Sequence, residues 1–173
     1  MVKEAIAAFL VLGAVVATSA REPNVLAKFD GGIGVIPVTG GAGTPNADGT
    51  LPNVKLNVVR GVSPAGPWRI ADLKAVVNAD GGIRVNGTGL LLASGNSIGT
   101  NANASVFATL ICEAAGPFTQ HNTGVVALDP DGNFTIVDTL DPVPSECPSP
   151  VLLIRSNGSG VWFAAGIPKL AGN

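Results

Sequence analysis

Tyrosine is absent from this chain of 173 residues, histidine occurs once, and charged side chains make up only 13% of the sequence. A single histidine cannot build the two- or three-histidine metal sites that small all-β enzymes commonly use. No serine lies in the Gly-x-Ser-x-Gly motif that marks the nucleophile of many hydrolases, and no cofactor fingerprint is present. With a net charge of −2 and no basic stripe, the sequence gives no reason to expect nucleic acid or an anionic membrane as a partner.

The single histidine, His121, lies in the polar segment Thr119–Thr123. An aspartate such as Asp129 or Asp138 could in principle orient this histidine beside a serine nucleophile. Polar neighbours on both sides are more typical of a solvated loop. We therefore predict that His121 is a loop residue in contact with solvent.

Only one hydrophobic run is long, and it lies at the start of the chain. The apolar run Ala5–Val16 follows a short charged segment and precedes the small residues Ala17–Ala20. This order is typical of a secretory signal peptide. We predict a signal peptide over residues 1–20, one domain over residues 21–173, and a secreted or periplasmic location. No later run approaches the roughly 18 apolar residues that a membrane span requires, so none is expected in the mature chain.

Cysteine occurs only twice, as Cys112 and Cys147. No Cys-x-x-Cys motif is present, and a metal site would need further ligands close by. An even pair in an exported protein is typical of a structural disulfide. We predict a Cys112–Cys147 bond that closes the loop between the two residues and stabilises the fold by roughly 3–4 kcal/mol.

Turn sequences, by contrast, are abundant. Asn78–Gly81 (Asn-Ala-Asp-Gly) and Asp129–Gly132 (Asp-Pro-Asp-Gly) each separate two apolar runs, and Asn46–Gly49 repeats the first of them. In such a turn the Asn or Asp side chain accepts a backbone hydrogen bond, and the glycine adopts the left-handed conformation that lets two strands pair. These tetrads predict β-hairpins.

One of the turns has an alternative interpretation. Asp129, Asp131 and Asn133 are spaced like the first ligands of a calcium loop. The complete loop also needs a glycine at its sixth position and a later bidentate carboxylate, and Gly132 comes too early. A bound cation at Asp129–Asn133 is therefore the alternative to a plain hairpin.

Short stretches between the turns alternate between apolar and polar residues, which is the period of a β-strand. After the predicted signal, no stretch offers ten residues of helical periodicity with a cap. We predict an all-β protein: an antiparallel β-sandwich, jelly-roll-like or Greek key, of about eight to ten short strands with little helix, and a barrel as the alternative. The predicted strands are Val25–Phe29, Ile33–Val38, Val54–Val62, Trp68–Asn78, Ile83–Ala93, Ser105–Cys112, Val125–Leu128, Phe134–Leu140, Val151–Arg155 and Val161–Ile167.

Four carboxylates are candidates for catalysis. Glu113 and Glu146 adjoin the two cysteines, so a disulfide would bring them near each other, and close carboxylates can share a proton or a cation. Asp138 and Asp141 lie outside the turn motifs. Because glycoside hydrolysis requires two carboxylates a few Å apart, a small secreted hydrolase that uses these residues is one alternative function.

A binding module is another alternative. Trp68 and Trp162 could form a flat platform for a sugar, although a tryptophan in a strand more often packs against the core. Glycosylation sequons occur at Asn86, Asn103, Asn133 and Asn157.

The leading interpretation is a secreted, non-catalytic structural or interaction module without a cofactor or a resident metal. It rests on the single histidine, the few carboxylates outside turns and the missing nucleophile motif. Its partner is unknown, and a protein at the cell surface or in the extracellular space is the expected class.

Overall fold

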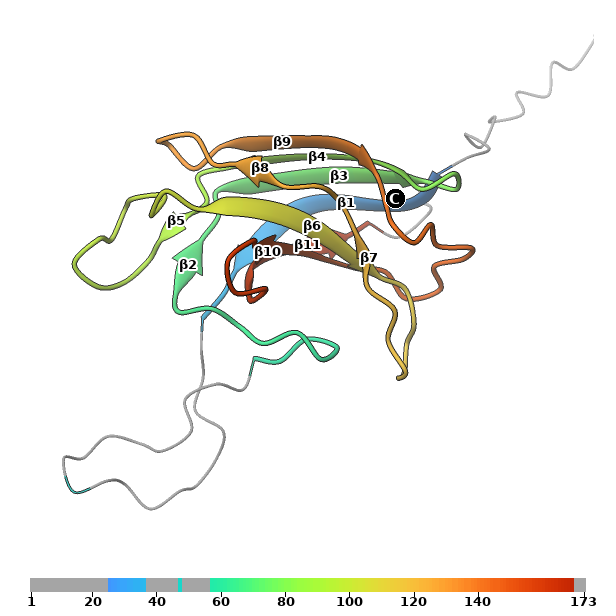
Figure 1. Cartoon of the computed structure of the whole chain (residues 1–173), viewed down its shortest axis with the longest axis horizontal. Helices are drawn as coiled ribbons and strands as arrows, with labels where there is room; N and C mark the ends of the chain where they lie inside the picture. The colour runs from blue at the N-terminus through green and yellow to red at the C-terminus, as the bar shows by residue number, and fades with distance from the viewer. Residues whose placement is uncertain (1–24, 37–46, 48–56, 170–173) are drawn as a thin grey trace, which may run out of the picture.

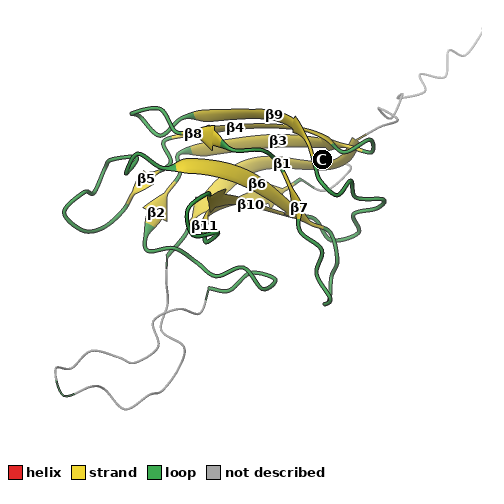
Figure 2. Cartoon of the chain, viewed as in Figure 1, coloured by secondary structure: helices red, strands yellow, loops and turns green. Residues whose placement is uncertain are grey.

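The structure is a computed structural model of the chain, and it describes residues 25–36, 47 and 57–169. Within these ranges the chain forms strands, turns and loops, without a helix (Figure 2). Accordingly, the described part holds no helix of the length and apolarity that a membrane crossing would need. The predicted signal peptide over residues 1–20 lies outside the described residues.

The strands are, in chain order, β1 (Val25–Gly34), β2 (Trp68–Arg69), β3 (Asp72–Asn78), β4 (Gly82–Thr88), β5 (Leu91–Leu92), β6 (Ser105–Ile111), β7 (His121–Asn122), β8 (Val126–Ala127), β9 (Phe134–Thr139), β10 (Val151–Ser156) and β11 (Trp162–Pro168).

Nine strands form one large antiparallel sheet in the order β7-β6-β10-β11-β1-β3-β4-β9, with β8 also paired to β6. The remaining two, β2 and β5, form a small separate pair. The large sheet curls into a half-barrel (Figure 1). The predicted all-β antiparallel fold is confirmed, and its form lies between the sandwich and the barrel that the sequence left open.

The two ends of the curled sheet are joined by backbone hydrogen bonds. Asn122, in β7, donates its N–H to the carbonyl of Asp141 at 2.9 Å, and Asp141 donates to the carbonyl of Asn122 at the same distance. Asp141 follows β9, the strand at the other end of the sheet. The junction between Asn122 and Asp141 therefore closes the curl at one end of the strands.

The hydrophobic core lies inside the curl. Along β3, Leu73, Ala75 and Val77 are buried while the residues between them are exposed, and β4 alternates in the same way. This pattern follows from the two-residue period of a strand that has one face in the core and the other exposed to solvent. By contrast, β6, β10 and β11 contain consecutive buried residues, as expected for strands that are covered on both faces.

The small sheet and the segment before it pack against β11. The ring of Trp68, in β2, stacks on that of Phe163, in β11, with centroids 4.0 Å apart. Trp162 donates its backbone N–H to the carbonyl of Ser63 at 3.0 Å and accepts the N–H of Ala65 at 3.0 Å. These contacts hold residues 63–69 against the sheet.

Of the two predicted hairpins in the described residues, the one at Asn78–Gly81 is confirmed and the one at Asp129–Gly132 is wrong. The Asn78–Gly81 turn joins β3 to β4, and Gly81 donates its N–H to the Asn78 carbonyl at 3.0 Å. The Asp129–Gly132 tetrad does form a turn between β8 and β9, in which Gly132 donates its N–H to the Asp129 carbonyl at 2.9 Å. The two strands do not pair with each other, because β8 pairs with β6 and β9 pairs with β4. Gly132 has a φ of 77°. A Cβ atom on Gly132 would lie 2.4 Å from the carbonyl oxygen of Leu90, so this glycine is required twice over. The third tetrad, Asn46–Gly49, lies outside the described residues except for Ala47.

Residues with positive φ explain why one predicted strand is wrong and why another is interrupted. Of the predicted strand Val54–Val62, residues 59–62 form a tight turn, residues 57 and 58 belong to no strand, and the rest is outside the described residues. Arg60 and Gly61 have φ values of 46° and 82°, which a β-strand cannot contain. The predicted strand Ile83–Ala93 ends at Thr88, because Gly89 has a φ of 64°.

Two other predicted strands differ in their continuity. Asp30–Gly32 does not separate two strands but forms a bulge inside β1, where the register with β11 shifts between Phe29 and Gly32. Trp68–Asn78 divides into β2 and β3, and each part pairs with a different strand. The predicted strands over Ser105–Cys112 and Phe134–Leu140 agree with β6 and β9 within one residue at either end.

The structure contains the predicted disulfide between Cys112 and Cys147, whose Cα atoms are 4.4 Å apart. A second link lies beside it. The Arg60 guanidinium donates to the Ile111 carbonyl at 3.0 Å and to the carbonyl and hydroxyl of Ser149 at 2.6 and 2.7 Å. The disulfide and Arg60 thus fasten the end of β6 to the chain that leads into β10.

Candidate functional site

The four candidate catalytic carboxylates do not form one site. The Glu113 Oε1 accepts the N–H of Thr119 at 3.1 Å, and its own backbone N–H and the Thr119 side chain hold the pKa of Glu113 below its ordinary value. Glu146 is exposed, and no hydrogen bond or shared partner joins it to Glu113 among the described contacts. The disulfide therefore places two glutamates near the same bridge without pairing them.

The two candidate aspartates, Asp138 and Asp141, take part in hydrogen bonds with the backbone. Asp138 accepts the N–H of Gly124 at 2.6 Å and that of Thr139 at 2.8 Å. These bonds stabilise the carboxylate and hold the pKa of Asp138 below its ordinary value. Asp141 acts through its main chain, at the junction with Asn122, while its side chain is exposed.

The prediction of a solvated loop histidine is wrong. His121 is only 6% exposed and forms β7 with Asn122, opposite Leu110 of β6. Its Nδ1 lies 2.5 Å from the Pro142 carbonyl oxygen. A carbonyl can only accept, so Nδ1 carries the proton and donates it. The imidazole thus reinforces the junction between β7 and the chain after β9.

The candidate calcium ligands are engaged in their own turn. Asp129 Oδ1 accepts the N–H groups of Asp131 and Asn133 at 2.9 and 2.8 Å, and Oδ2 accepts the Asn133 amide at 3.0 Å. The N–H of Asn133 is the main reason that the pKa of Asp129 lies below its ordinary value. In the ranges that the structure describes, no three His, Cys, Asp or Glu residues are grouped as a metal site would require.

The two tryptophans do not form a sugar platform. Trp68 is 5% exposed and Trp162 is 2% exposed, so neither presents a face to solvent. Trp68 is stacked on Phe163, and the Trp162 Nε1 donates to the Asn57 carbonyl at 2.8 Å. The interpretation as an aromatic platform for carbohydrate is wrong for these residues, because both belong to the core.

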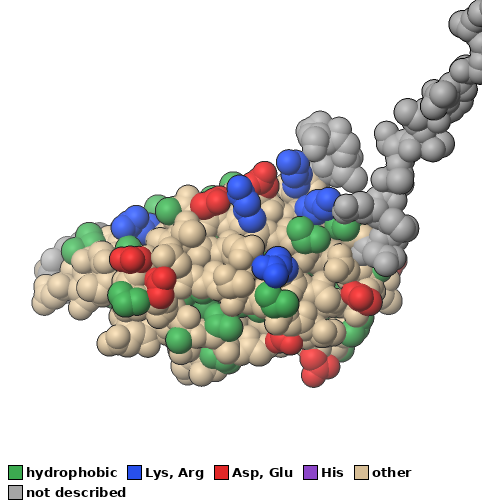
Figure 3. Space-filling model, turned by 90° about the horizontal axis from the view of Figure 1, so that it is seen from above, with side chains coloured by type: hydrophobic (Ala, Val, Ile, Leu, Met, Phe, Trp, Pro, Cys, Tyr) green, Lys and Arg blue, Asp and Glu red, His purple; other side chains and the backbone are tan. Residues whose placement is uncertain are grey.

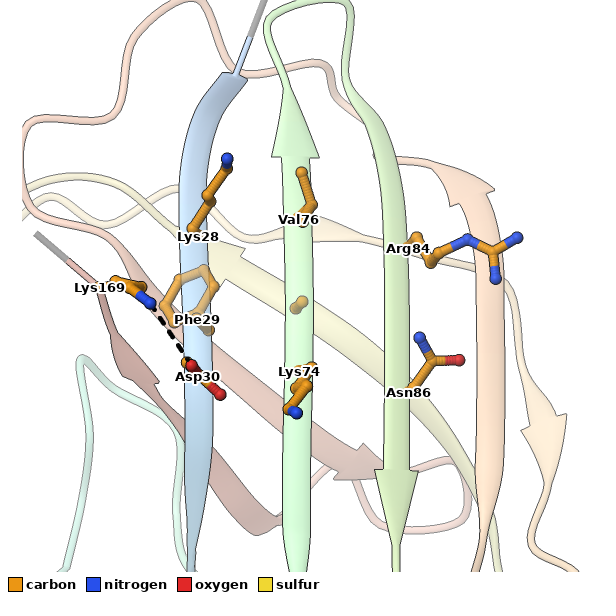
Figure 4. Close-up of a pocket in the computed structure, with 9 residues that line it drawn as sticks. Lys28, Phe29, Asp30, Lys74, Val76, Arg84, Asn86 and Lys169 are labelled. Atoms are coloured by element: carbon orange, nitrogen blue, oxygen red, sulfur yellow. Dashed lines mark ion pairs between the residues drawn. The ribbon is translucent and has the colours of Figure 1, made fainter. Parts of the chain in front are cut away.

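A concavity of about 230 Å³ lies on the outer face of β1, β3 and β4. Figure 4 shows its side chains in two rows that cross the three strands. We call this surface the basic face. Its lining consists of Lys28, Phe29, Asp30, Lys74, Ala75, Val76, Arg84, Asn86 and Lys169.

Sheet register explains how the basic face forms. Lys28 of β1 lies opposite Val76 of β3, which in turn lies opposite Arg84 of β4. The next outward row contains Asp30, Lys74 and Asn86, paired in the same manner. Alternate residues of a strand point to the same side, so both rows face outward. Lys169 reaches the face from the residue after β11, where its N–H bonds to the Lys28 carbonyl at 2.8 Å.

Positive charge is concentrated on this face. Four of the seven lysines and arginines in the described residues line it, and Figure 3 shows such side chains gathered on the side of the molecule seen from above. Asp30 pairs with Lys169 at 3.6 Å, and Asp72 pairs with Lys74 at 3.9 Å. Arg84 makes no hydrogen bond or ion pair with any residue that the structure describes.

Two of the other three cations, Arg60 and Arg155, form hydrogen bonds within the fold. Arg60 donates to Ile111 and Ser149, as described above. Arg155 donates to the Gly160 carbonyl at 2.7 Å and to Gln120 at 2.6 Å, and burial lowers its pKa. Arg69 is exposed and lies outside the basic face.

The basic face is not evident from the sequence, where we predicted no basic stripe. Its cations are separated by up to 141 positions along the chain, between Lys28 and Lys169. A signal for it does exist, because Lys28 and Asp30, Lys74 and Val76, and Arg84 and Asn86 each occupy alternate positions of a strand.

Comparison of the chain with protein-family models, with curated proteins and with solved structures found no significant similarity.

Proposed function

We propose that this protein is a secreted, non-catalytic structural or interaction module, and that it engages its partner through the basic face. The observation that carries the proposal is the concavity on β1, β3 and β4, where cationic side chains surround an open surface. Binding surfaces are typically concave and present a few polar groups that fix the partner.

The state of the carboxylates supports a non-catalytic role over hydrolysis. A general acid in glycoside hydrolysis needs a raised pKa, so that it is protonated near neutral pH. Hydrogen bonds lower the pKa of Glu113 and of Asp138 instead. Both carboxylates are therefore suited to accepting backbone hydrogen bonds, which is what they do.

Secretion is part of the proposal. A disulfide is compatible with an extracellular location, because such bonds persist in oxidising compartments. The apolar run Ala5–Val16 supplies the export signal, and residues 21–173 form the exported domain.

The proposal is tested by assaying the secreted chain for turnover and for binding in parallel. Chromogenic glycosides, esters and peptides should release no product, and Glu146→Gln and Asp138→Asn should behave like the wild type. An array of extracellular glycans and proteins should retain the wild type, and Arg84→Glu should weaken that retention. Turnover that disappears in Glu146→Gln or Asp138→Asn would overturn the proposal, as would a chain that stays in the cytoplasm.

A further inference from the structure

We propose that the basic face binds an acidic extracellular polysaccharide, that is, a sugar chain with uronate carboxylates or sulfates. This inference rests on the proposed function, since it names the class of partner that the exported module would meet.

The spacing of the cations favours a chain of anions over a single ion. Lys28 and Arg84 lie in one row, two strands apart, which corresponds to about 10 Å between backbones. Lys74 belongs to the neighbouring row on the strand between them. One phosphate or sulfate could contact only one or two of these cations, because donors must lie within about 3 Å of its oxygens. A polymer with repeated charges can reach all of them.

The local charge balance is favourable. Four cations and one carboxylate, Asp30, line the concavity, and one of the cations, Arg84, has no ion-pair partner among the residues that the structure describes. The two ion pairs, at 3.6 and 3.9 Å, involve side chains that are about half exposed. Such surface pairs contribute little to stability, so an incoming anion can replace Asp30 or Asp72 at small cost.

Asn86 adds a directional donor. The Thr135 hydroxyl donates to the Asn86 Oδ1 at 3.1 Å, which fixes the amide with its NH₂ group available to a ligand. An amide donor beside a cation suits the hydroxyl and carboxylate groups of a uronate sugar.

The absence of an accessible ring argues for a polysaccharide over nucleic acid. Single-stranded nucleic acid is generally held by bases that stack on aromatic side chains. The one aromatic residue in the lining, Phe29, is 3% exposed and belongs to the core. Binding to the basic face should therefore be electrostatic and sensitive to salt.

The test measures binding of the secreted chain to polygalacturonate, which carries carboxylates, and to dextran sulfate, with neutral dextran and single-stranded DNA as comparison ligands. Calorimetry at about 50 mM NaCl should detect binding to at least one of the two acidic polysaccharides, and about 500 mM NaCl should abolish it. Which of the two binds distinguishes carboxylate from sulfate recognition. Neutral dextran should not bind.

Charge reversal on and off the basic face provides the matched control. Arg84→Glu should weaken binding about tenfold or more, whereas Arg69→Glu, with the same change of charge on an exposed residue elsewhere, should weaken it less than about twofold. Circular dichroism and thermal unfolding would show that both variants are folded.

Three results would overturn the inference: no binding of either acidic polysaccharide at low salt, equal losses in Arg84→Glu and Arg69→Glu, or tighter binding of DNA than of both polysaccharides. None of them would affect the non-catalytic assignment, which depends on the separate turnover measurement. Conversely, turnover of a substrate would overturn the proposed function even if a polysaccharide binds.

Discussion

At the scale of single residues, several carboxylates of this protein accept hydrogen bonds from backbone N–H groups. Asp138 accepts two such groups, from Gly124 and Thr139, and Asp129 and Glu113 accept them in the same manner. A carboxylate held in this way is stabilised in its ionised form, and its pKa falls. The stability of the folded chain should therefore depend on pH in the acidic range.

Replacement of Asp138 by asparagine tests this dependence. The pKa of Asp138 in the folded chain lies below the ordinary value of 3.8. Its stabilising contribution is therefore present above pH 3.8 and is lost as the pH falls through the folded-state pKa. We expect Asp138→Asn to lower the midpoint of urea unfolding at neutral pH, and the difference from the wild type to shrink at about pH 2–3.

The control for this experiment is Asp131→Asn. The Asp131 carboxylate accepts no hydrogen bond from the residues that the structure describes, although its N–H donates to Asp129. Its replacement should leave the midpoint nearly unchanged at both pH values. A loss in Asp138→Asn that is the same in acid as at neutral pH would contradict the assigned role of the carboxylate.

Gly34 is a second residue for which the structure explains why no larger side chain fits. A Cβ atom at this position would lie 2.2 Å from the carbonyl oxygen of Trp68, and a backbone atom cannot move aside by changing rotamer. We expect Gly34→Ala to lower the free energy of unfolding by about 3 kcal/mol. Gly66→Ala, where nothing lies within 4 Å, should change it by less than about 0.5 kcal/mol in the same denaturant titration. Equal effects would show that the close approach at Gly34 does not exist in solution.

At the scale of elements, the sequence predicts those strands whose pairing is local. The Asn78–Gly81 turn joins β3 to β4, so alternation and turn residues together indicate both strands and their register. β7 is different, because His121 and Asn122 become a strand only by pairing with Leu110 and Thr109 of β6. The polar segment around His121 therefore resembles a loop in sequence, and its burial depends on contacts that no local pattern encodes.

The link between Arg60 and Ser149 should act together with the disulfide. Removal of the disulfide by Cys112→Ala with Cys147→Ala should cost about 3–4 kcal/mol, from the loop of 35 residues that it closes. Arg60→Ala removes three hydrogen bonds from its guanidinium to Ile111 and Ser149, and it should cost about 2 kcal/mol.

These two changes should not be additive. Without the disulfide, Ser149 is held less firmly, so the hydrogen bonds of Arg60 contribute less. In a double-mutant cycle measured by denaturant unfolding, we expect the combined loss to be smaller than the sum by at least about 0.5 kcal/mol. A sum that is additive within error would mean that the two links stabilise the fold independently.

At the scale of the whole molecule, the all-β class and the disulfide could be predicted from the sequence, whereas the curl and the basic face could not. Strand order depends on which edges meet, and β1 lies between β11 and β3 although the sequence separates it widely from β11. The basic face needs this order, because Lys28 and Lys169 come together only through the pairing of β1 with β11. The sequence identifies the candidate carboxylates by residue type, but it does not predict which backbone groups they bond to.

The junction between β7 and the chain after β9 should control self-association. His121 fastens it through the Pro142 carbonyl, beside the two backbone bonds between Asn122 and Asp141. We expect His121→Ala to release strand edges and to raise light scattering during mild heating, because open edges pair with other chains. Val77→Ala, a buried change in the middle of the sheet, is the control at matched thermal stability. Similar scattering from both variants would contradict this role of His121.

The same junction bears on how a partner can be recognised. An extended peptide often binds a sheet by adding to it as one more strand, with affinity supplied by the main chain. The main-chain groups of Asn122 and Asp141 that point across the junction are already paired with each other, so that mode is closed there. The strands of the basic face, β1, β3 and β4, are likewise each paired on both sides. Recognition at the basic face therefore depends on side chains, and a few substitutions among them could change the partner while leaving the fold intact.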